Sequence, residues 1–295
     1  MPRLFRRIGL MVRLASKPSV LQLVQTLANH LNSQGLSVFI AQEEGDDPWI
    51  PSYTVISPQV LGQTVDLVIV IGGDGTMLSA ARLLAPHHTP MMGINQGRLG
   101  FMVDVLPHDM IRSVDTVLSG CFISEARQLI SATVLRRKKT IAEGIALNDV
   151  VFSRGSMGQM IEFEVFIDQQ FVYTQRSDGL IVTTPTGSTA YALAAGGPIL
   201  HPTLPAFTIV PVSPHSMSYR PIVIGDQSII EWVLTSGVDA CVHFDGQSRV
   251  DLKNHDHVLI KRYTHTLKLI HPVGYSYYDM LRGKLHWGKK LLSES

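Results

Sequence analysis

The 295-residue sequence has few cysteines, almost no net charge and no long apolar run. Its two cysteines, Cys121 and Cys241, lie outside any CxxC pattern, which indicates a reducing compartment and argues against zinc or iron–sulfur ligation. A single bridge between them is the open alternative. A formal charge of +1 gives no reason to expect nucleic acid or an anionic membrane as a partner. Since no stretch approaches the roughly 20 apolar residues that span a bilayer, we expect a cytoplasmic protein with small-molecule partners.

The first 120 residues alternate between strand and helix patterns. Residues 8–14 are predicted as a buried strand, and apolar side chains then recur at helical spacing from Val20 to Leu31, before Gly35. Further strands are predicted at SVFIA, VDLVIVI and PMMGI, with a Pro-rich polar connection after the first of them. Helices are expected over 76–84 and in LPHDMIRSVDTVLSG. This β-α-β-α-β order predicts a parallel, doubly wound sheet.

Beyond Gly120 the pattern changes, because strands follow one another through short turns. They are predicted at LISATVLRR, IALNDVVFSR, MIEFEVFID, QFVYTQ and GLIVTT, and again from SIIEWVLT to TLKLI. The basic run at 136–139 is expected to be a solvated hairpin turn. We predict three parts: a Rossmann-like α/β domain over residues 1–105, a β-sandwich domain over 106–272, and a helical segment over 273–295 that packs back on the first domain.

The stretch TVDLVIVIGGDGTMLSAARLL, residues 64–84, passes from a strand through glycines into a helix. Such a turn binds anions, because backbone N–H groups point at the ligand and the helix dipole favours negative charge. Gly72, Gly73, Gly75 and Thr76 form this candidate phosphate loop. The Rossmann fingerprint would need a glycine where Leu78 stands, and the Walker pattern would need a following lysine, which is absent.

Asp74 lies at the centre of this loop. An aspartate beside a polyphosphate raises the energy unless it binds Mg²⁺ or faces a hydroxyl whose proton it can take. A hydroxyl that becomes a phosphate ester must lose its proton, and a positioned carboxylate is the usual acceptor. The loop is therefore typical of a kinase without a Walker motif. A plain strand-to-helix turn with Asp74 as the N-cap is the alternative.

A second candidate is QRSDGLIVTTPTGSTAYALAAGGPILHP, residues 175–202. Arg176 and Asp178 precede a strand, and a hydroxyl-rich turn then leads into an Ala-rich helix. Such a turn offers hydroxyls and N–H groups to a ligand, and the alanines leave room for a flat ring. A hydroxyl-capped helix is the alternative, which leaves the Arg-Ser-Asp triplet unexplained.

A third candidate is the Asn148–Asp149 pair, which interrupts the otherwise apolar strand IALNDVVFS. Unpaired polar groups are costly to bury, and a carboxylate can accept both neighbouring hydroxyls of a ribose. A β-bulge at the surface is the alternative. In HFDGQ, Asp245 and Gly246 are expected to form a hairpin turn before Gln247. The 12 histidines show no ligand spacing, so no protein ligand of a metal is assigned.

Taken in order, GGDGT, GINQGRLGFM, LNDVVFSRG, SDGLIVTTPTGSTAYALAAGGPILHP, PVSPHSMSYRP and HFDGQ resemble the NAD kinase family, in particular its bacterial branch. The resemblance implies transfer of the γ-phosphoryl of ATP, with a divalent metal such as Mg²⁺, to the 2′-hydroxyl of the adenosine ribose of NAD. The products would be NADP and ADP. It also implies an α/β domain followed by a β-sandwich domain, and a homodimer or homotetramer.

The resemblance also implies roles for individual residues. Asp74 would be the proton acceptor, Gly75 would lie against the dinucleotide, and Asn148 with Asp149 would hold the ribose. The other NAD-contacting positions that it implies are Gln159, Arg176, Asp178, Thr189, Ala190, Tyr191, Ala192, Leu193, Ala194 and Gln247. Arg98 in NQGRLG is a further cation whose role stays open.

Two other functions are compatible with parts of this pattern. GGDGT is shared with lipid kinases of the diacylglycerol type, which should carry an apolar or basic membrane-docking feature that this sequence does not show. A non-enzymatic dinucleotide-binding sensor, in which Asp74 only caps a helix, is the other alternative. The sequence favours an enzyme that binds ATP and NAD, with neither nucleic acid nor a membrane as a partner.

Overall fold

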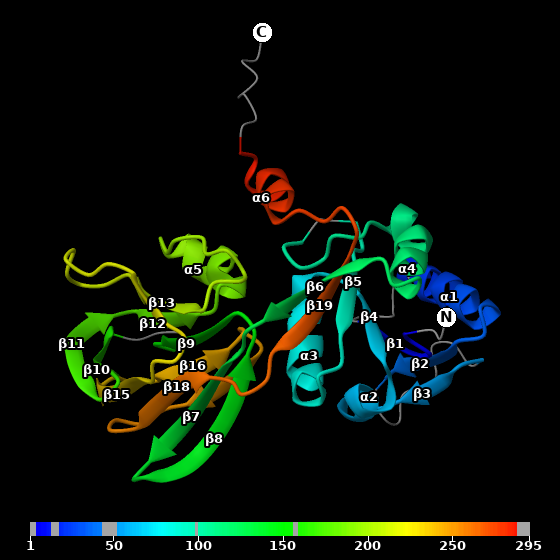
Figure 1. Cartoon of the computed structure of the whole chain (residues 1–295). Helices are drawn as coiled ribbons and strands as arrows, with labels where there is room; N and C mark the ends of the chain where they lie inside the picture. The colour runs from blue at the N-terminus through cyan, green and yellow to red at the C-terminus, as the bar shows by residue number, and fades with distance from the viewer. Residues whose placement is uncertain (1–3, 13–17, 43–51, 98–99, 156–158, 288–295) are drawn as a thin grey trace. The chain divides into compact units, whose positions relative to one another are not determined.

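The computed structural model describes residues 4–12, 18–42, 52–97, 100–155 and 159–287. The chain divides into two compact units: Met1–Glu125 with Leu267–Ser295, and Ala126–Thr266 (Figure 1). The boundaries expected from the sequence, after residues 105 and 272, differ from this division. The reason is that the helix of 110–118 and the strand of 267–272 pack with the first unit's sheet.

The first unit is built on a seven-stranded sheet with the order β3-β2-β1-β4-β5-β19-β6. Its strands are β1 (Arg7–Val12), β2 (Ser37–Ala41), β3 (Thr54–Ile56), β4 (Leu67–Ile71), β5 (Met91–Ile94), β6 (Phe122–Arg127) and β19 (Leu267–Pro272). Each neighbouring pair from β3 to β19 is parallel. This arrangement confirms the predicted doubly wound α/β fold.

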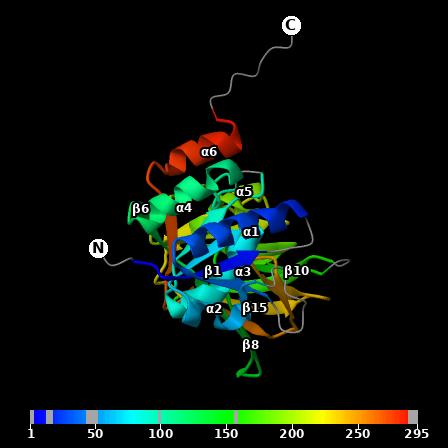
Figure 2. The same ribbon diagram turned by 90° about the vertical axis from the view of Figure 1, so that its right-hand side faces the viewer.

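Helices cover both faces of this sheet. Along β4, Leu67, Ile69 and Ile71 join a buried cluster with α1 (Pro18–Ser33) and α4 (Met110–Leu118), whereas the side chains between them point to the opposite face. That opposite face is covered by α2 (Pro58–Thr64) and α3 (Asp74–Leu84), as Figures 1 and 2 show. The alternation along the central strand therefore places one helix pair on each side.

Several elements of the first unit differ from the predictions. The Pro-rich connection contains the three-residue strand β3 and the seven-residue helix α2, both too short for a periodic pattern to show. Helix α3 begins at Asp74, two residues before the predicted start. The closing helix α6 (Tyr277–Leu285) also belongs to this unit, with the Ser276 hydroxyl accepting a hydrogen bond from the Asp279 N–H.

The second unit consists of two six-stranded antiparallel sheets. The first has the order β11-β10-β15-β18-β7-β8 and the second the order β14-β13-β12-β9-β16-β17. The strands are β7 (Ile130–Arg136), β8 (Lys139–Ala146), β9 (Asp149–Ser153), β10 (Ile161–Ile167), β11 (Gln170–Ser177), β12 (Gly179–Thr183), β13 (Ala206–Val212), β14 (Ile222–Gly225), β15 (Ile230–Ser236), β16 (Cys241–Phe244), β17 (Ser248–Asp251) and β18 (His257–Arg262).

Side chains of both sheets share one buried cluster, which confirms the predicted β-sandwich. Phe152 of β9 stacks on Trp232 of β15 with ring centroids 5.4 Å apart, and Phe163 of β10 meets Phe152 edge-on at 5.0 Å. At the predicted basic turn, Arg137 and Lys138 have φ angles of 50° and 64° and connect β7 to β8. Two consecutive positive φ angles are typical of a tight hairpin turn.

The stretch IALNDVVFS is two strands and not the single strand predicted. Strand β8 ends at Ala146 in one sheet, and β9 begins at Asp149 in the other sheet. Leu147 and Asn148 lie between them, at the point where the chain crosses from sheet to sheet. The apolar residues on either side of Asn148 and Asp149 do not reveal such a crossing, because both strands contribute to the same buried core.

Candidate functional site

The glycine loop passes from β4 directly into α3. Gly73 is the N-cap of the helix, with extended backbone angles. A Cβ atom at Gly72 would lie 2.4 Å from the Thr76 hydroxyl oxygen, so a side chain there would push against the first helical turn. Thr76 is buried, and its N–H donates to the Gly73 carbonyl. The loop is therefore tight, and it presents the N-terminus of an 11-residue helix.

Asp74 is the first residue of α3 and not its N-cap, so the capping alternative is wrong. Its two carboxylate oxygens accept hydrogen bonds from the N–H groups of Phe101, at 2.9 Å, and Met102, at 3.0 Å. A Cβ atom at Gly100 would lie 2.3 Å from the Asp74 Oδ1 atom. The half-buried carboxylate is thus held by the backbone of a distant segment. Arg98, four residues before Met102, lies outside the described residues.

The Asn148–Asp149 pair lies at the start of β9, beside the turn between β16 and β17. Asp245 of this turn is buried, and its carboxylate accepts hydrogen bonds from the N–H groups of Leu147, Asn148 and Asp149. Asp149 is only 4% exposed. Burial, and then the negative charge of Asp245, raise the pKa of Asp149 to about 7. The surface β-bulge alternative is therefore wrong, because this carboxyl group is buried.

The hydroxyls of the hydroxyl-rich turn donate hydrogen bonds within the protein. Thr184 Oγ1 donates to the Leu147 carbonyl at 2.6 Å, and Thr183 Oγ1 donates to the Asn148 carbonyl at 2.9 Å. Ser188 Oγ donates to the Pro185 carbonyl and accepts from the Leu200 N–H. The turn is therefore bonded to the residues that precede β9.

The predicted Ala-rich helix is short. A 3₁₀ turn, Thr186–Thr189, leads to the four-residue helix α5 (Tyr191–Ala194), because Ala190 has the non-helical angles φ −99° and ψ −129°. Along this segment Thr189, Ala190 and Leu193 are half-buried, Ala192 is buried, and Tyr191 and Ala194 are exposed. Gly196, with φ 86°, follows the helix and ends it.

Asp178 pairs with Arg154 and not with its neighbour in the predicted Arg-Ser-Asp triplet. Arg154 Nε lies 2.9 Å from Asp178 Oδ1, and the Arg154 N–H also donates to the Asp178 carbonyl. Arg176 is exposed on β11, a strand at the edge of its sheet. Sequence reasoning missed Arg154, which directly follows a buried strand in VFSRG.

A cavity of about 290 Å³ lies over this ion pair. Arg154, Asp178 and Tyr191 line it, together with Val151, Ser153, Gly155, Gly179, Val212 and Ser213. Tyr191 is 46% exposed. The cavity thus combines an ion pair with an available aromatic face. Gln159 and Gln247 are both exposed and do not line it.

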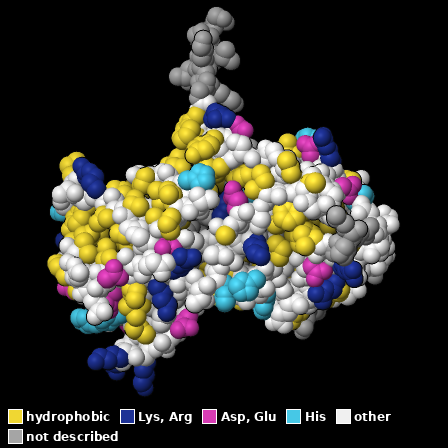
Figure 3. Space-filling view, in the orientation of Figure 1, with side chains coloured by type: hydrophobic (Ala, Val, Ile, Leu, Met, Phe, Trp, Pro, Cys, Tyr) yellow, Lys and Arg dark blue, Asp and Glu magenta, His cyan; other side chains and the backbone are white. Residues whose placement is uncertain are grey.

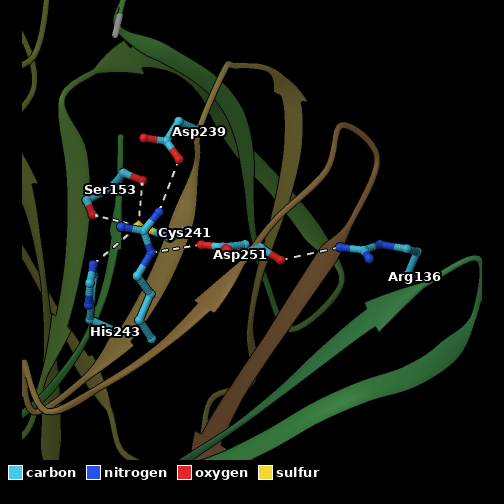
Figure 4. Close-up of polar contacts among 7 residues, drawn as sticks. Arg136, Ser153, Asp239, Cys241, His243 and Asp251 are labelled. Atoms are coloured by element: carbon cyan, nitrogen blue, oxygen red, sulfur yellow. Dashed lines mark hydrogen bonds and ion pairs between the residues drawn. The ribbon is translucent and has the colours of Figure 1, made fainter. Parts of the chain in front are cut away.

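The β16–β17 hairpin that carries Asp245 is braced by a polar network (Figure 4). Arg249 donates to Asp251 at 2.8 Å and to Asp239 at 3.1 Å, and Arg136 donates to the Asp251 carbonyl. Nearby, the buried Cys241 thiol lies 3.2 Å from His243 Nε2. Burial and the Arg249 charge lower the pKa of His243. The Arg249 contacts therefore link the two sides of the hairpin whose turn contains Asp245.

Other features of the surface are less specific. On the face shown in Figure 3, acidic and basic side chains are interspersed. Cys121 and Cys241 are both free thiols, so the alternative of one bridge is wrong. Within the described residues, no three His, Cys, Asp or Glu side chains gather in a way that could hold a metal ion. No helix in the described part of the chain has the length and apolar character needed to cross a membrane.

Two family models match the chain. The ATP-NAD kinase N-terminal domain matches residues 9–122, and the ATP-NAD kinase C-terminal domain matches residues 147–272. Among curated relatives, the NAD kinase of Laribacter hongkongensis is 57% identical over 289 residues, 98% of this chain and 99% of the relative. That of Chromobacterium violaceum is 56% identical over 292 residues, 99% of this chain and 100% of the relative.

Solved structures show the same fold at low sequence identity. A yeast NADH kinase complexed with NADH has a TM-score of 0.87 and 22% identity, covering 98% of this chain and 90% of that chain. An NAD kinase from Archaeoglobus fulgidus in complex with ATP has a TM-score of 0.75 and 23% identity, covering 95% of this chain and 98% of that chain. Together with the two matching family models and the close relatives, this shows that the chain belongs to the NAD kinase family.

Proposed function

We propose that the chain is an ATP-dependent NAD kinase that transfers the γ-phosphoryl group of ATP to the 2′-hydroxyl of the adenosine ribose of NAD. The hydroxyl oxygen bonds to the γ-phosphorus as the bond between that phosphorus and the bridging oxygen breaks, giving NADP and ADP. The hydroxyl proton passes to Asp74. Relatives named NAD kinase, at 56% and 57% identity over nearly the whole chain, support the reaction class. Membership in this family leaves no support for the lipid-kinase alternative.

The geometry of Asp74 is the observation that carries the proposed mechanism. Each carboxylate oxygen accepts one backbone N–H, which fixes the plane of the group and leaves further lone pairs for a ligand. A carboxylate held in this way is suited to accept a hydroxyl proton without first reorienting. Its place at the start of α3 puts it beside the helix N-terminus, which favours the negative charge of phosphates.

The donor set of the described residues fits a divalent metal that is carried mainly by the phosphates of ATP. Mg²⁺ is usually bound by one or two carboxylates plus substrate phosphates and keeps several waters. The loop supplies one carboxylate, Asp74, and no cluster of three ligands is found among the described residues. When bound, such an ion would neutralise charge on the transferring phosphoryl group. The phosphates would lie against the backbone of the glycine loop, which is formed by Gly72, Gly73, Gly75 and Thr76.

We assign the binding of NAD in the second unit to two groups of residues. Asn148 and Asp149 would hold the ribose through its hydroxyls. The cavity over Asp178 and Tyr191 would take a flat ring, because an exposed aromatic face favours stacking and a carboxylate accepts N–H groups. Thr189 to Ala194 would form the wall of this pocket. Gln159, Arg176 and Gln247, all exposed, would act at its margin.

We also propose a cytoplasmic homodimer or homotetramer. Two free thiols suit a reducing compartment. Apolar side chains that are exposed on the edge strand β11, Phe171 and Val172, are of the kind that a second subunit covers. Light scattering on the purified protein tests the oligomer, and a monomer at micromolar concentration would contradict it.

The decisive test replaces Asp74 by asparagine. Asp74→Asn keeps the shape but removes the proton acceptor, so NADP formation should fall by about a hundred- to ten-thousandfold. NAD binding, measured by calorimetry, should survive. The control is Asp109→Asn, which changes an exposed carboxylate of the same unit and should leave turnover near normal. Near-normal turnover of Asp74→Asn would exclude the base role.

A further inference from the structure

Asp245 makes contacts that a hairpin turn does not require. Its φ angle is 52° and that of Gly246 is 63°, which suits the turn itself. Its carboxylate, however, reaches residues 96 to 98 positions away: Oδ2 accepts the Leu147 N–H at 3.1 Å, and Oδ1 accepts those of Asn148 at 2.8 Å and Asp149 at 3.3 Å. The Asp245 N–H in turn donates to the Asp149 carbonyl at 3.0 Å.

Two of these residues, Leu147 and Asn148, are also held by the hydroxyl-rich segment. The Thr184 N–H and Thr183 Oγ1 both donate to the Asn148 carbonyl at 2.9 Å, and Thr184 Oγ1 donates to the Leu147 carbonyl. The backbone of residues 147–149 is therefore fixed by two elements. The Asn148 Oδ1 atom, by contrast, is buried with no hydrogen-bond partner among the described residues. A buried polar atom in that state is expected to serve a ligand or a water.

We propose that Asp245 is a positioning residue for the nucleotide-binding pair Asn148 and Asp149, which it orients through their backbone and influences through its charge. The proposal rests on the assignment of that pair to NAD. A carboxylate that accepts three N–H groups restricts the backbone conformation of residues 147–149. The side chains of Asn148 and Asp149 therefore point in fixed directions. Arg249, through its bonds to Asp251 and Asp239, links the two sides of the β16–β17 hairpin that carries Asp245.

The charge of Asp245 acts on Asp149. β9 lies between β12 and β16 in its sheet. Asn148, which precedes Asp149, also accepts a hydrogen bond from the Thr184 N–H of the 184–189 turn. The titratable and charged groups on these neighbours are Cys241, His243, Asp245, Arg249 and Asp251 of the hairpin, with Arg127, which donates to Thr186 in the turn. Of these, Asp245 raises the pKa of Asp149, in addition to burial. Ionised Asp149 accepts ribose hydroxyls best, so NAD affinity should rise as the pH increases through about 7.

The experiment measures NAD affinity by calorimetry from pH 5.5 to 8.5 in the full-length protein and in Asp245→Asn. Asparagine has one acceptor oxygen in place of two, so at least one of the three N–H groups loses its partner. At pH 8.5 we expect a ten- to hundredfold weaker affinity for NAD, with turnover at saturating NAD changed only a few-fold because Asp74 is untouched. The pH midpoint of affinity should also move down, since the repelling charge is gone. A merely structural role would not shift this midpoint.

The matched control is Glu143→Gln, which removes an exposed carboxylate of β8 in the same unit and should leave both affinity and midpoint unchanged. An unchanged NAD affinity in folded Asp245→Asn, or an equal loss in the control, would overturn the proposal. If Asp245→Asn does not fold, the pH dependence of NAD affinity in the wild-type protein still tests the effect of charge. An affinity that stays constant between pH 5.5 and 8.5 would overturn the proposal. Wild-type protein that forms no NADP from ATP and NAD would instead contradict the proposed function.

Discussion

Asp74 and Asp245 are both held by backbone N–H groups of a distant segment, yet their surroundings differ. Asp74 is half-buried at the start of a helix and accepts two N–H groups, so it keeps an accessible edge. Asp245 is buried and accepts three, so its hydrogen-bonding capacity is directed inward. Asp149 is buried beside Asp245 and has a raised pKa. The three aspartates therefore differ in burial and in hydrogen-bond partners, and these differences suit them to different roles.

A substitution at Gly100 tests whether the backbone contacts that hold the Asp74 carboxylate matter for turnover. The φ angle of Gly100 does not require glycine, but a Cβ atom there would lie 2.3 Å from Asp74 Oδ1. Gly100→Ala should therefore displace the carboxylate and lower turnover by at least about tenfold, with little change in the melting temperature. Steady-state kinetics and thermal unfolding measure both. Gly225→Ala, where the added Cβ meets open space, is the control. Unaltered turnover of Gly100→Ala would show that the Phe101 and Met102 contacts do not matter.

Asp149 should make stability depend on pH. Its pKa in the folded protein is about 7, against an ordinary 3.8, so between these values the folded protein holds a proton that the unfolded chain has released. The contribution of this group is therefore fully present below about pH 4 and is lost as the pH rises through about 7. Urea unfolding of wild type and Asp149→Asn from pH 4 to 8 measures it. The wild type should lose stability relative to the variant over this window, and a constant difference would contradict the assignment.

At this scale, sequence reasoning identified residues whose type was unexpected in their context. Asp74 stood out within a glycine loop, and Asn148 with Asp149 stood out within an apolar run. Arg154 and Asp245 did not stand out, because a basic residue after a strand and an Asp-Gly turn are common at the surface. Their importance depends on partners that are 24 and about 97 positions away in the chain, Asp178 and the segment 147–149.

Among the elements, the turn of residues 184–189 shows how a ligand-like pattern can be structural. Its hydroxyls resemble a phosphate cradle in the sequence, but that of Thr184, like that of Thr183 just before the turn, bonds to a carbonyl at the crossing between β8 and β9. We therefore expect the turn to help orient Asn148 even where it touches no ligand. Conversely, the buried strand and helix of the glycine loop were predicted closely, since long periodic segments carry their own signal.

Thr184→Val tests this bracing role. The change keeps the volume but removes the hydroxyl that donates to Leu147 and accepts from the Gly187 N–H, and both groups are buried. Urea unfolding should show a loss of about 1–3 kcal/mol, and NAD affinity should weaken because Asn148 is less well held. Thr203→Val, at an exposed turn, is the control and should change neither. Unchanged stability and affinity of Thr184→Val would show that the turn does not brace residues 147–149.

At the scale of the whole molecule, the fold class was predictable but the path of the chain was not. The change from alternating helices and strands to strands alone predicted the two architectures. The return of β19 to the first unit was not predicted, because its residues LKLIHP resemble any strand of the sandwich. Only its partners, β5 and β6, distinguish it.

Removing β19 and the residues after it should disrupt the first unit and leave the second unit folded. A chain ending at residue 266 lacks β19, which lies between β5 and β6 and buries Leu267, Leu269, Ile270 and His271. We expect loss of NADP formation and exposure of apolar surface, followed by dye binding and by hydrogen exchange of β4 and β5. Residues 126–266 should keep their protected amides, which serve as the internal control. Native-like protection of β5 in the truncated chain would contradict this expectation.

The late position of β19 also has a consequence for synthesis. The ribosome must translate all of residues 126–266 before the strand that covers β5 emerges. At usual translation rates this leaves the growing sheet with an open edge for roughly 10 to 30 s. During that interval the edge of β5 is free to pair with strands of other nascent chains. A chaperone that binds this edge during synthesis would therefore prevent such pairing until β19 emerges.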